Sequence, residues 1–164
     1  MIDYSPKHTP LLHGIVLTKD QALKTPEDQH FMTDKPYHEV LRSIMYTQVA
    51  TRPDLSYAIS TLSKFASNPG KPHWNAMIHV LHYIKGSLHF KITYRGKGHT
   101  DLAPVEYVDA DYGSDLDMCH SCARQVFIQA GGPTSWGAQL LPTVALSTTE
   151  AEYMAVSWGA KQIK

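Results

Sequence analysis

Residues 105–115, VEYVDADYGSD, decide most of what the sequence predicts about the fold. Val105, Tyr107 and Asp109 recur at a period of two, which is typical of a β-strand. Asp109 lies near the end of this apolar run, and Asp111 follows it in the expected loop. A carboxylate is costly to bury unless it is paired or binds a metal ion. The stretch therefore predicts a strand that ends in functional or solvated acidic side chains.

A second stretch, VALSTTEAEYMA at residues 144–155, predicts the start of a helix. Ser147 or Thr148 is the expected N-cap, and Glu150 lies three residues after Ser147, as in a capping box. The helix dipole alone explains Glu150, whereas Glu152 points in a different direction, near the edge of the expected buried face. If the fold brings the two acidic stretches together, their charge needs a cation, which favours metal-assisted phosphodiester chemistry.

The 164 residues are 43% hydrophobic and 18% charged, enough for one ordinary core or one domain and part of a second. Residues 1–100 contain 12 lysines and arginines against 7 aspartates and glutamates, and residues 101–164 contain 3 against 8. This split fits either uneven composition or a basic region that faces a polyanion beside an acidic region that binds cations. We find no apolar run of membrane-spanning length and no signal peptide, and the two cysteines form no disulfide framework.

The pattern of apolar residues divides the chain. Residues 1–33 predict a loop or extended linker, since proline and glycine interrupt them. Three helices are expected next: residues 37–50, a helix that begins at Pro53 and ends before Asn68, and one that begins at Pro72 and ends at Gly86. Strands are expected over residues 90–94 and 105–109, followed by a hairpin that turns at residues 131–132. The final helix is expected to continue to the last residue.

Several other motifs have ordinary explanations. Tyr107 and Asp109 resemble part of a polymerase Tyr-x-Asp-Asp turn, but alanine follows Asp109, so we reject that interpretation. Cys119 and Cys122 form one Cys-x-x-Cys pair, which is short of the four ligands of a structural zinc site. Three histidines in the third helix are expected to be solvated or to face nucleic acid: His73, His79 and His82. Four basic side chains form a candidate phosphate-binding series or a plain charged surface: Lys64, Lys71, Lys85 and Arg95.

Many ordered motifs along the chain resemble the Pol polyprotein of copia-type (Pseudoviridae) LTR retrotransposons. The segments TRPDL at residues 51–55 and VLHYIKG at residues 80–86 resemble the region that follows the reverse transcriptase palm. The segments VDADY at residues 108–112 and VALSTTEAEY at residues 144–153 resemble the ribonuclease H region. The similarity extends over nearly the whole chain.

This resemblance implies an α+β or α/β architecture with three parts. Residues 1–33 would be an extended linker, residues 34–88 a helical thumb or connection segment of the reverse transcriptase, and residues 89–164 a truncated RNase H-like domain with a partial mixed sheet and one helix. In the family, two Mg²⁺ ions held by acidic side chains activate water and stabilise the leaving oxygen when the RNA strand of an RNA–DNA hybrid is cut. Carried over by motif, Asp109 and Glu152 are the catalytic and metal-binding residues.

The resemblance also implies partners and departures. The expected partners are an RNA–DNA hybrid and the remainder of the Pol polyprotein, with no membrane, in the cytoplasm, in virus-like particles or in the nucleus. The family's later aspartate, on a strand beyond the last helix, has no counterpart before Lys164. Arg124 occupies a position where the family usually has glycine. We therefore expect an inactive fragment; a non-catalytic nucleic-acid-binding protein and a functionless remnant of a retroelement are the alternatives.

Overall fold

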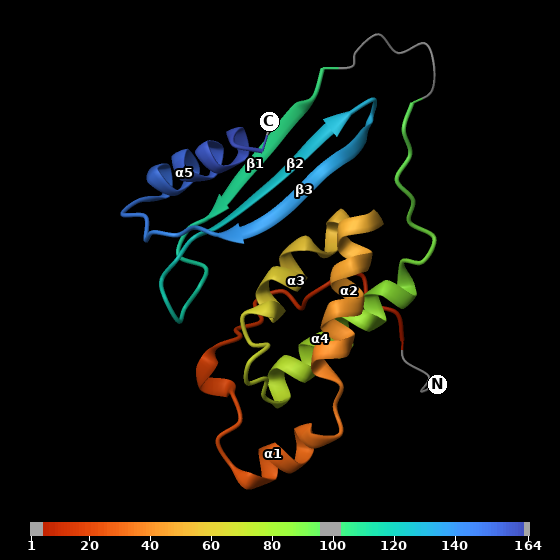
Figure 1. The fold of residues 1–164 in the computed structure, drawn as a ribbon, viewed down its shortest axis with the longest axis vertical. Coiled ribbons are helices and arrows are strands. Elements are labelled where there is room, and N and C mark those ends of the chain that lie inside the picture. Colours follow the sequence, from red (N-terminus) through yellow and green to blue (C-terminus); the bar gives the residue numbers. More distant parts are fainter. Residues whose placement is uncertain (1–4, 96–102, 163–164) are drawn as a thin grey trace. The chain divides into compact units, whose positions relative to one another are not determined.

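The computed structural model of the chain describes residues 5–95 and 103–162. It divides into two compact units, Met1–Phe90 and Lys91–Lys164, which Figure 1 draws as a group of helices and as a sheet with one helix. The described part is an α+β fold, and none of its helices is both long and apolar enough to cross a membrane. The first unit contains η1 (Lys19–Gln21), α1 (Pro26–Thr33), α2 (Tyr37–Thr51), η2 (Pro53–Leu55), α3 (Ser56–Ser63) and α4 (Lys71–Gly86). The second contains β1 (Val105–Asp111), β2 (Cys122–Gln129), β3 (Gly132–Leu140) and α5 (Thr148–Ala160).

Helices α2, α3 and α4 form the core of the first unit, and each lies where the apolar period predicts a helix. The fully buried residues of this core include Leu55, Leu62 and Met77. Burying each such side chain contributes roughly 1.5–3 kcal/mol to the stability of the fold. The hydroxyl of Tyr37, at the start of α2, donates to the carbonyl oxygen of Leu62 at 2.9 Å. Burial raises the pKa of this hydroxyl well above its usual range, so it stays a donor. The second predicted helix is shorter than expected, because α3 ends at Ser63.

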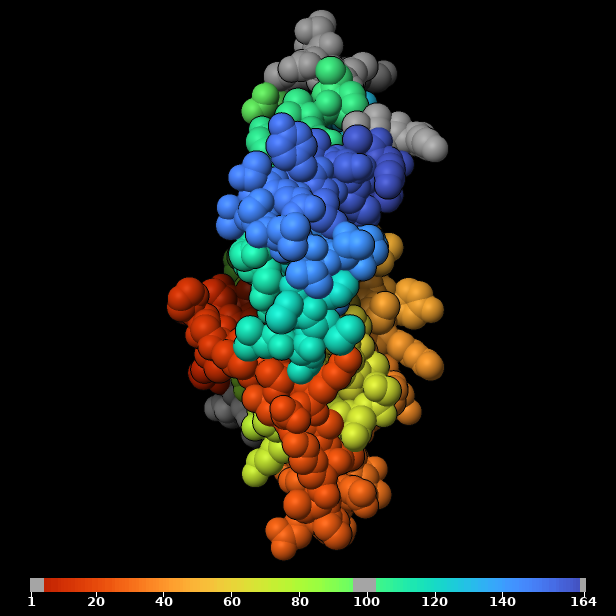
Figure 2. Space-filling view, turned by 90° about the vertical axis from the view of Figure 1, so that its left-hand side faces the viewer, coloured from red at the N-terminus to blue at the C-terminus, as the bar shows by residue number. Residues whose placement is uncertain are grey.

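The prediction of a loop or extended segment over residues 1–33 is wrong in part. Residues Pro26–Thr33 form α1, which Thr25 caps by accepting a hydrogen bond from the backbone nitrogen of Asp28 at 3.1 Å. Pro26 at the first helical position has a backbone angle already suited to a helix. Only Met32 of α1 is buried, and the helix lies at the surface of its unit (orange in Figure 2).

The histidines of α4 were expected to face solvent or nucleic acid, and for two of them this is wrong. His73 is fully buried, stacks on Phe65 with ring centroids 4.1 Å apart, and pairs with the carbonyl oxygen of Thr18 at 3.1 Å. His79 is buried as well and pairs with the carbonyl oxygen of Thr9 at 2.9 Å. A ring nitrogen of each histidine is hydrogen-bonded to a backbone carbonyl oxygen of the N-terminal segment, so the two histidines hold that segment against α4.

In the second unit, β1, β2 and β3 form an antiparallel sheet in that order. The β2–β3 hairpin turns through Ala130 and Gly131, whose φ angles are 51° and 79°. Two consecutive positive φ angles define the tight turn whose twist matches that of the flanking strands, and glycine adopts such an angle without strain. The predicted hairpin is therefore confirmed, one residue earlier than expected. The prediction of a mixed sheet is wrong for the described residues, since both pairings are antiparallel.

Helix α5 covers one face of this sheet. Ala155 lies in a small cluster with Ala123 of β2 and with Leu141, and Val108 and Ala110 of β1 pack against it. Three of these residues, Ala110, Ala123 and Ala155, are small, which lets the helix approach the strands closely. The predicted N-cap is confirmed, because the Ser147 hydroxyl accepts from the backbone nitrogen of Glu150 at 3.1 Å.

Two further predictions about the second unit are wrong. Residues 90–94 form no strand. Instead, the backbone nitrogen of Arg95 donates to Ala130 at 2.7 Å and the hydroxyl of Tyr94 donates to Pro133 at 2.7 Å, so this segment meets the hairpin through single contacts. The turn expected at residues 96–98 lies outside the described residues. The final helix was expected to continue to Lys164, but α5 ends at Ala160.

Candidate functional site

Asp109 lies on β1 directly opposite Arg124 of β2. A terminal nitrogen of Arg124, Nη1, donates to Oδ2 of Asp109 at 3.2 Å, and the other, Nη2, donates to Oδ2 of Asp111 at 2.7 Å. The Asp109 side chain is 63% exposed and that of Asp111 is 41% exposed. The expected cost of burying Asp109 is therefore avoided, because solvent and one guanidinium share its charge.

The two aspartates lie on the face of the sheet that α5 does not cover. Side chains alternate between the faces of a strand, and Val108 and Ala110 pack toward α5. Asp109 and Asp111 must then point to the other face. Arg124 does so too, because its neighbour Ala123 belongs to the cluster under α5.

Glu152 lies on α5 and is exposed. The neighbouring acidic residue, Glu150, has a structural role, because its carboxylate accepts a hydrogen bond from the backbone nitrogen of Leu146 at 2.7 Å while its own backbone nitrogen donates to Ser147. The sequence prediction that the helix terminus explains Glu150 is thus confirmed. Glu152 takes no part in this cap, and its carboxylate is available to solvent.

The direction of α5 brings Glu152 level with Asp109 along the sheet. Helix α5 runs antiparallel to β1 (Figure 1), and Gly159 lies against Glu106 and Val108. The path back from Gly159 to Glu152 covers about 10 Å along a helix. The path from Glu106 on to Asp109 covers about 10 Å along a strand. The two proposed catalytic carboxylates therefore lie at the same height, one on each side of β1, which is an edge strand of the described sheet.

A magnesium ion does not fit these side chains as they are arranged. Arg124 already binds the carboxylates of Asp109 and Asp111, and a divalent cation beside it would meet a fixed positive charge. Within residues 5–95 and 103–162, no three histidine, cysteine, aspartate or glutamate side chains are grouped closely enough to hold a metal ion. Asp109 and Glu152 remain the predicted ligands of the family's metal, without support from a formed metal site.

The acidic and cysteine residues between β1 and the start of β2 differ in their exposure to solvent. Asp115, expected to be solvated, is only 6% exposed, and its backbone nitrogen and oxygen bind His120 and Cys119 across the loop. Cys119 is exposed and Cys122 is buried, and both are free thiols.

The four predicted phosphate-binding residues do not form one group. Lys71 begins α4 and Lys85 lies in its last turn, about 20 Å away along the helix. Lys64 follows the end of α3, and the Lys71 ammonium lies 5.3 Å from the centre of the Phe31 ring. Arg95 belongs to the other unit. These positions supply scattered positive charge and no continuous track for a nucleic acid backbone.

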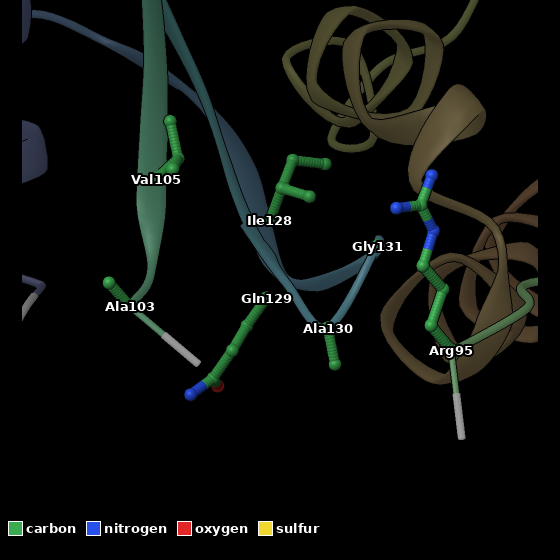
Figure 3. Close-up of a pocket in the computed structure, with 7 residues that line it drawn as sticks. All are labelled: Arg95, Ala103, Val105, Ile128, Gln129, Ala130 and Gly131. Carbon is green, nitrogen blue, oxygen red and sulfur yellow. The ribbon is translucent and has the colours of Figure 1, made fainter. Parts of the chain in front are cut away.

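Arg95 lies at a small cavity of about 220 Å³ beside the hairpin turn (Figure 3). Its side chain passes Gly131, and Ala103, Val105, Ile128 and Gln129 supply most of the remaining lining. The lining carries one charged group among mainly apolar ones, which gives an anion little to bind.

Sequence reasoning missed two arginines. It treated Arg124 only as a departure from a family pattern, although a basic residue opposite an aspartate is a recognisable cross-strand pair once the hairpin register is known. It also missed Arg52, which is buried, binds Asp54 through two nitrogens at 2.7 and 3.0 Å, and donates to the hydroxyl of Ser87 at 2.6 Å. No local signal identifies that partner, because Ser87 is distant in sequence.

Curated proteins match this chain along most of its length. It is 37% identical over 163 residues to the retrovirus-related Pol polyprotein from transposon TNT 1-94 of Nicotiana tabacum, covering 99% of this chain and 12% of that protein. It is 34% identical over 157 residues to the retrovirus-related Pol polyprotein from transposon RE2 of Arabidopsis thaliana, covering 96% of this chain and 10% of that protein. It is also 40% identical over 126 residues to the secreted RxLR effector protein 161 of Plasmopara viticola, covering 77% and 87% respectively.

No family model and no solved structure matches the chain. The chain belongs to the copia-type retrotransposon Pol polyproteins, as the resemblance predicted, because these relatives match most of its length. It spans about a tenth of the length of the two Pol polyproteins described above.

Proposed function

We propose that residues 103–162 derive from the ribonuclease H region of a copia-type Pol polyprotein. In this proposal the complete parent domain cuts the RNA strand of RNA–DNA hybrids by two-metal hydrolysis, with Asp109 and Glu152 among its ligands. The chain itself has negligible activity. Residues 34–88 belong to the helical connection that precedes this domain and contribute no catalytic group.

One observation carries the proposal: the Pol polyprotein from transposon TNT 1-94 matches 99% of this chain, a span that includes β1 with Asp109 and α5 with Glu152. Asp109 points to the sheet face that α5 leaves open and Glu152 lies on α5, so β1 lies between the two carboxylates and they do not meet on one face as they are arranged.

Two features support the inactivity of this chain. Arg124 binds Asp109 and Asp111 and offsets one of their two negative charges, and no third acidic ligand joins the pair among the described residues. Metal-assisted hydrolysis needs carboxylates that are free to hold cations. Asp109, one of the two proposed ligands, is bound by Arg124 instead.

The proposal is tested by incubating the purified chain with an RNA–DNA hybrid and Mg²⁺. We expect no cleavage of the RNA strand above the level of a buffer control. Asp109→Asn is the matched variant, since it removes one carboxylate oxygen and keeps the side-chain size. Cleavage by the wild-type chain that disappears in Asp109→Asn would contradict the proposed inactivity.

A second candidate function is binding of hybrids without cleavage. The excess of lysine and arginine over aspartate and glutamate in residues 1–100, 12 against 7, favours it, with Lys71 and Lys85 exposed on α4. Binding of this kind weakens steeply with salt and does not need Mg²⁺. Fluorescence anisotropy with a labelled hybrid, at two salt concentrations and with or without EDTA, distinguishes it: salt-dependent, EDTA-insensitive binding supports this candidate, and no binding at low salt rejects it.

A further inference from the structure

We infer that Arg124 is the resident cation of the Asp109–Asp111 pair and keeps divalent metal ions from this face of the sheet. The inference rests on the proposed function, since it names the side chain that competes with a metal ion for the acidic residues of β1. The site is then one whose charge is partly offset from within by a competing side chain, and not only one that lacks a ligand.

The geometry gives Arg124 both carboxylates at once. A guanidinium presents its donors in a rigid planar fork, and here the two terminal nitrogens reach two different residues, Asp109 at 3.2 Å and Asp111 at 2.7 Å. Asp109 and Asp111 lie on the same face of β1, so a cation between them meets both. The guanidinium occupies that position.

The backbone holds the arginine in place. Asp109 and Arg124 are direct partners in the β1–β2 ladder, so their β-carbons are fixed about 5 Å apart. The arginine need not be ordered from a distant loop, and its side chain is only 35% exposed. Because the strand ladder fixes its backbone opposite Asp109, the guanidinium stays within reach of both carboxylates.

Charge then excludes the metal. A divalent cation that binds Asp109 or Asp111 must either displace the guanidinium or sit within a few ångströms of its positive charge, and either costs affinity. Exposed ion pairs contribute little to stability, so removing Arg124 exposes the carboxylates without a large loss of the fold. The same change therefore creates an acidic pair open to cations.

Titration with Mn²⁺ tests the inference, because its paramagnetism broadens the NMR amide signals of nearby residues. In the full wild-type chain we expect no selective broadening at residues 109–111. In Arg124→Ala we expect selective broadening there, with an affinity at least about tenfold higher than in the wild type. Adding Asp111→Asn to Arg124→Ala removes the gain.

The control is Lys161→Ala, which removes the same charge from the same unit at the far end of α5. It is expected to behave as the wild type. Equal Mn²⁺ affinity in the wild type and Arg124→Ala, or an equal gain in Lys161→Ala, overturns the inference. Should Arg124→Ala lose its dispersed amide spectrum, Arg124→Gln, which keeps much of the length of the side chain, decides by the same criteria. The titration contains no nucleic acid, so its failure leaves the hybrid-cleavage result unaffected.

Discussion

The helical unit and the sheet unit bury charge in opposite ways. In the helical unit, Arg52 is 7% exposed and is bound by Asp54 and Ser87. In the sheet unit, an oxygen of Glu106 is buried between β1 and α5 with no hydrogen-bond partner among the described residues. A fully partnered buried charge fixes the position of its neighbours, whereas an unpartnered one destabilises the layer that covers it.

The hydrophobic core of the helical unit is also built from larger side chains than that of the sheet unit. The helical core contains large, fully buried side chains such as Leu62 and Met77. The core under α5 is built on Ala123, Leu141 and Ala155. Since the free energy of burial follows the apolar area removed from water, the helical unit is expected to be the more stable of the two. Because the core under α5 is small, a destabilising side chain on β1 leaves the sheet unit with little stability in reserve.

The largest effect is expected from Arg52→Ala. It leaves Asp54 half-buried without its cation and removes the guanidinium that lies 5.5 Å from the Tyr83 ring. We expect the helical unit to lose about 3 kcal/mol. Hydrogen exchange followed by mass spectrometry measures it, with faster exchange in α2–α4 and unchanged exchange in β1–β3. Arg52→Lys keeps the positive charge but not the planar guanidinium, and is expected to lose less stability. Equal exchange in the wild type and Arg52→Ala would show that the contacts of Arg52 with Asp54 and Ser87 do not stabilise the unit.

The opposite sign is expected for Glu106→Val in the sheet unit. The change removes the unpartnered oxygen, gives Phe127 an apolar cross-strand neighbour and relieves the close approach to Gly159. We expect a stabilisation of about 1 kcal/mol, seen as slower hydrogen exchange in β1 and α5. Glu152→Val, which removes an exposed glutamate from α5, is the control and should give no gain. A lower stability of Glu106→Val would mean that this carboxylate has a partner.

A smaller effect is expected from pH. Burial favours the protonated form of Asp54, but hydrogen bonds from Arg52 and Tyr83 and the charge of Arg52 outweigh it, so the pKa of Asp54 lies below its usual value. A carboxyl whose pKa is lowered by folding stabilises the fold above its unfolded pKa, and this contribution is lost as the pH falls through the folded value. From about pH 5 to about pH 2, the wild-type melting temperature should therefore fall more steeply than that of Asp54→Asn. Far-UV circular dichroism measures both, and parallel curves would contradict the account.

The sequence predicted the elements with clear local signals. The apolar stripes of α2 and α4, the Ser147 cap and the alternation along β1 all depend on residues close together in the chain. It missed α1, whose apolar stripe is weak and leaves only Met32 buried, although Thr25 and Pro26 form a recognisable helix start. Capping residues such as Thr25 and Pro26 therefore indicate a helix start even where the apolar residues show no helical period.

The sequence proposes the residues of the candidate site by motif and does not predict the electrostatics around them. Motif and spacing point to Asp109 and Glu152, and the antiparallel packing of α5 on β1 puts them level. The pairing of Arg124 with Asp109 depends on the strand register between β1 and β2, which no residue close to either one in the chain sets. A change of one residue in that register would move Arg124 to the other face. Long-range register is what local sequence patterns do not contain.

The central claim is that residues 109 and 152 lie at the same end of the β1–α5 layer. Pulsed electron paramagnetic resonance tests it with spin labels at 109 and 152 and, for comparison, at 109 and 161, in a chain whose two cysteines are replaced by serine or alanine. Positions 152 and 161 are about 13 Å apart along α5. We predict a narrow distance distribution for the 109–152 pair, with a shorter mean than that of the 109–161 pair. A 109–152 distance equal to or longer than the 109–161 distance would contradict the account.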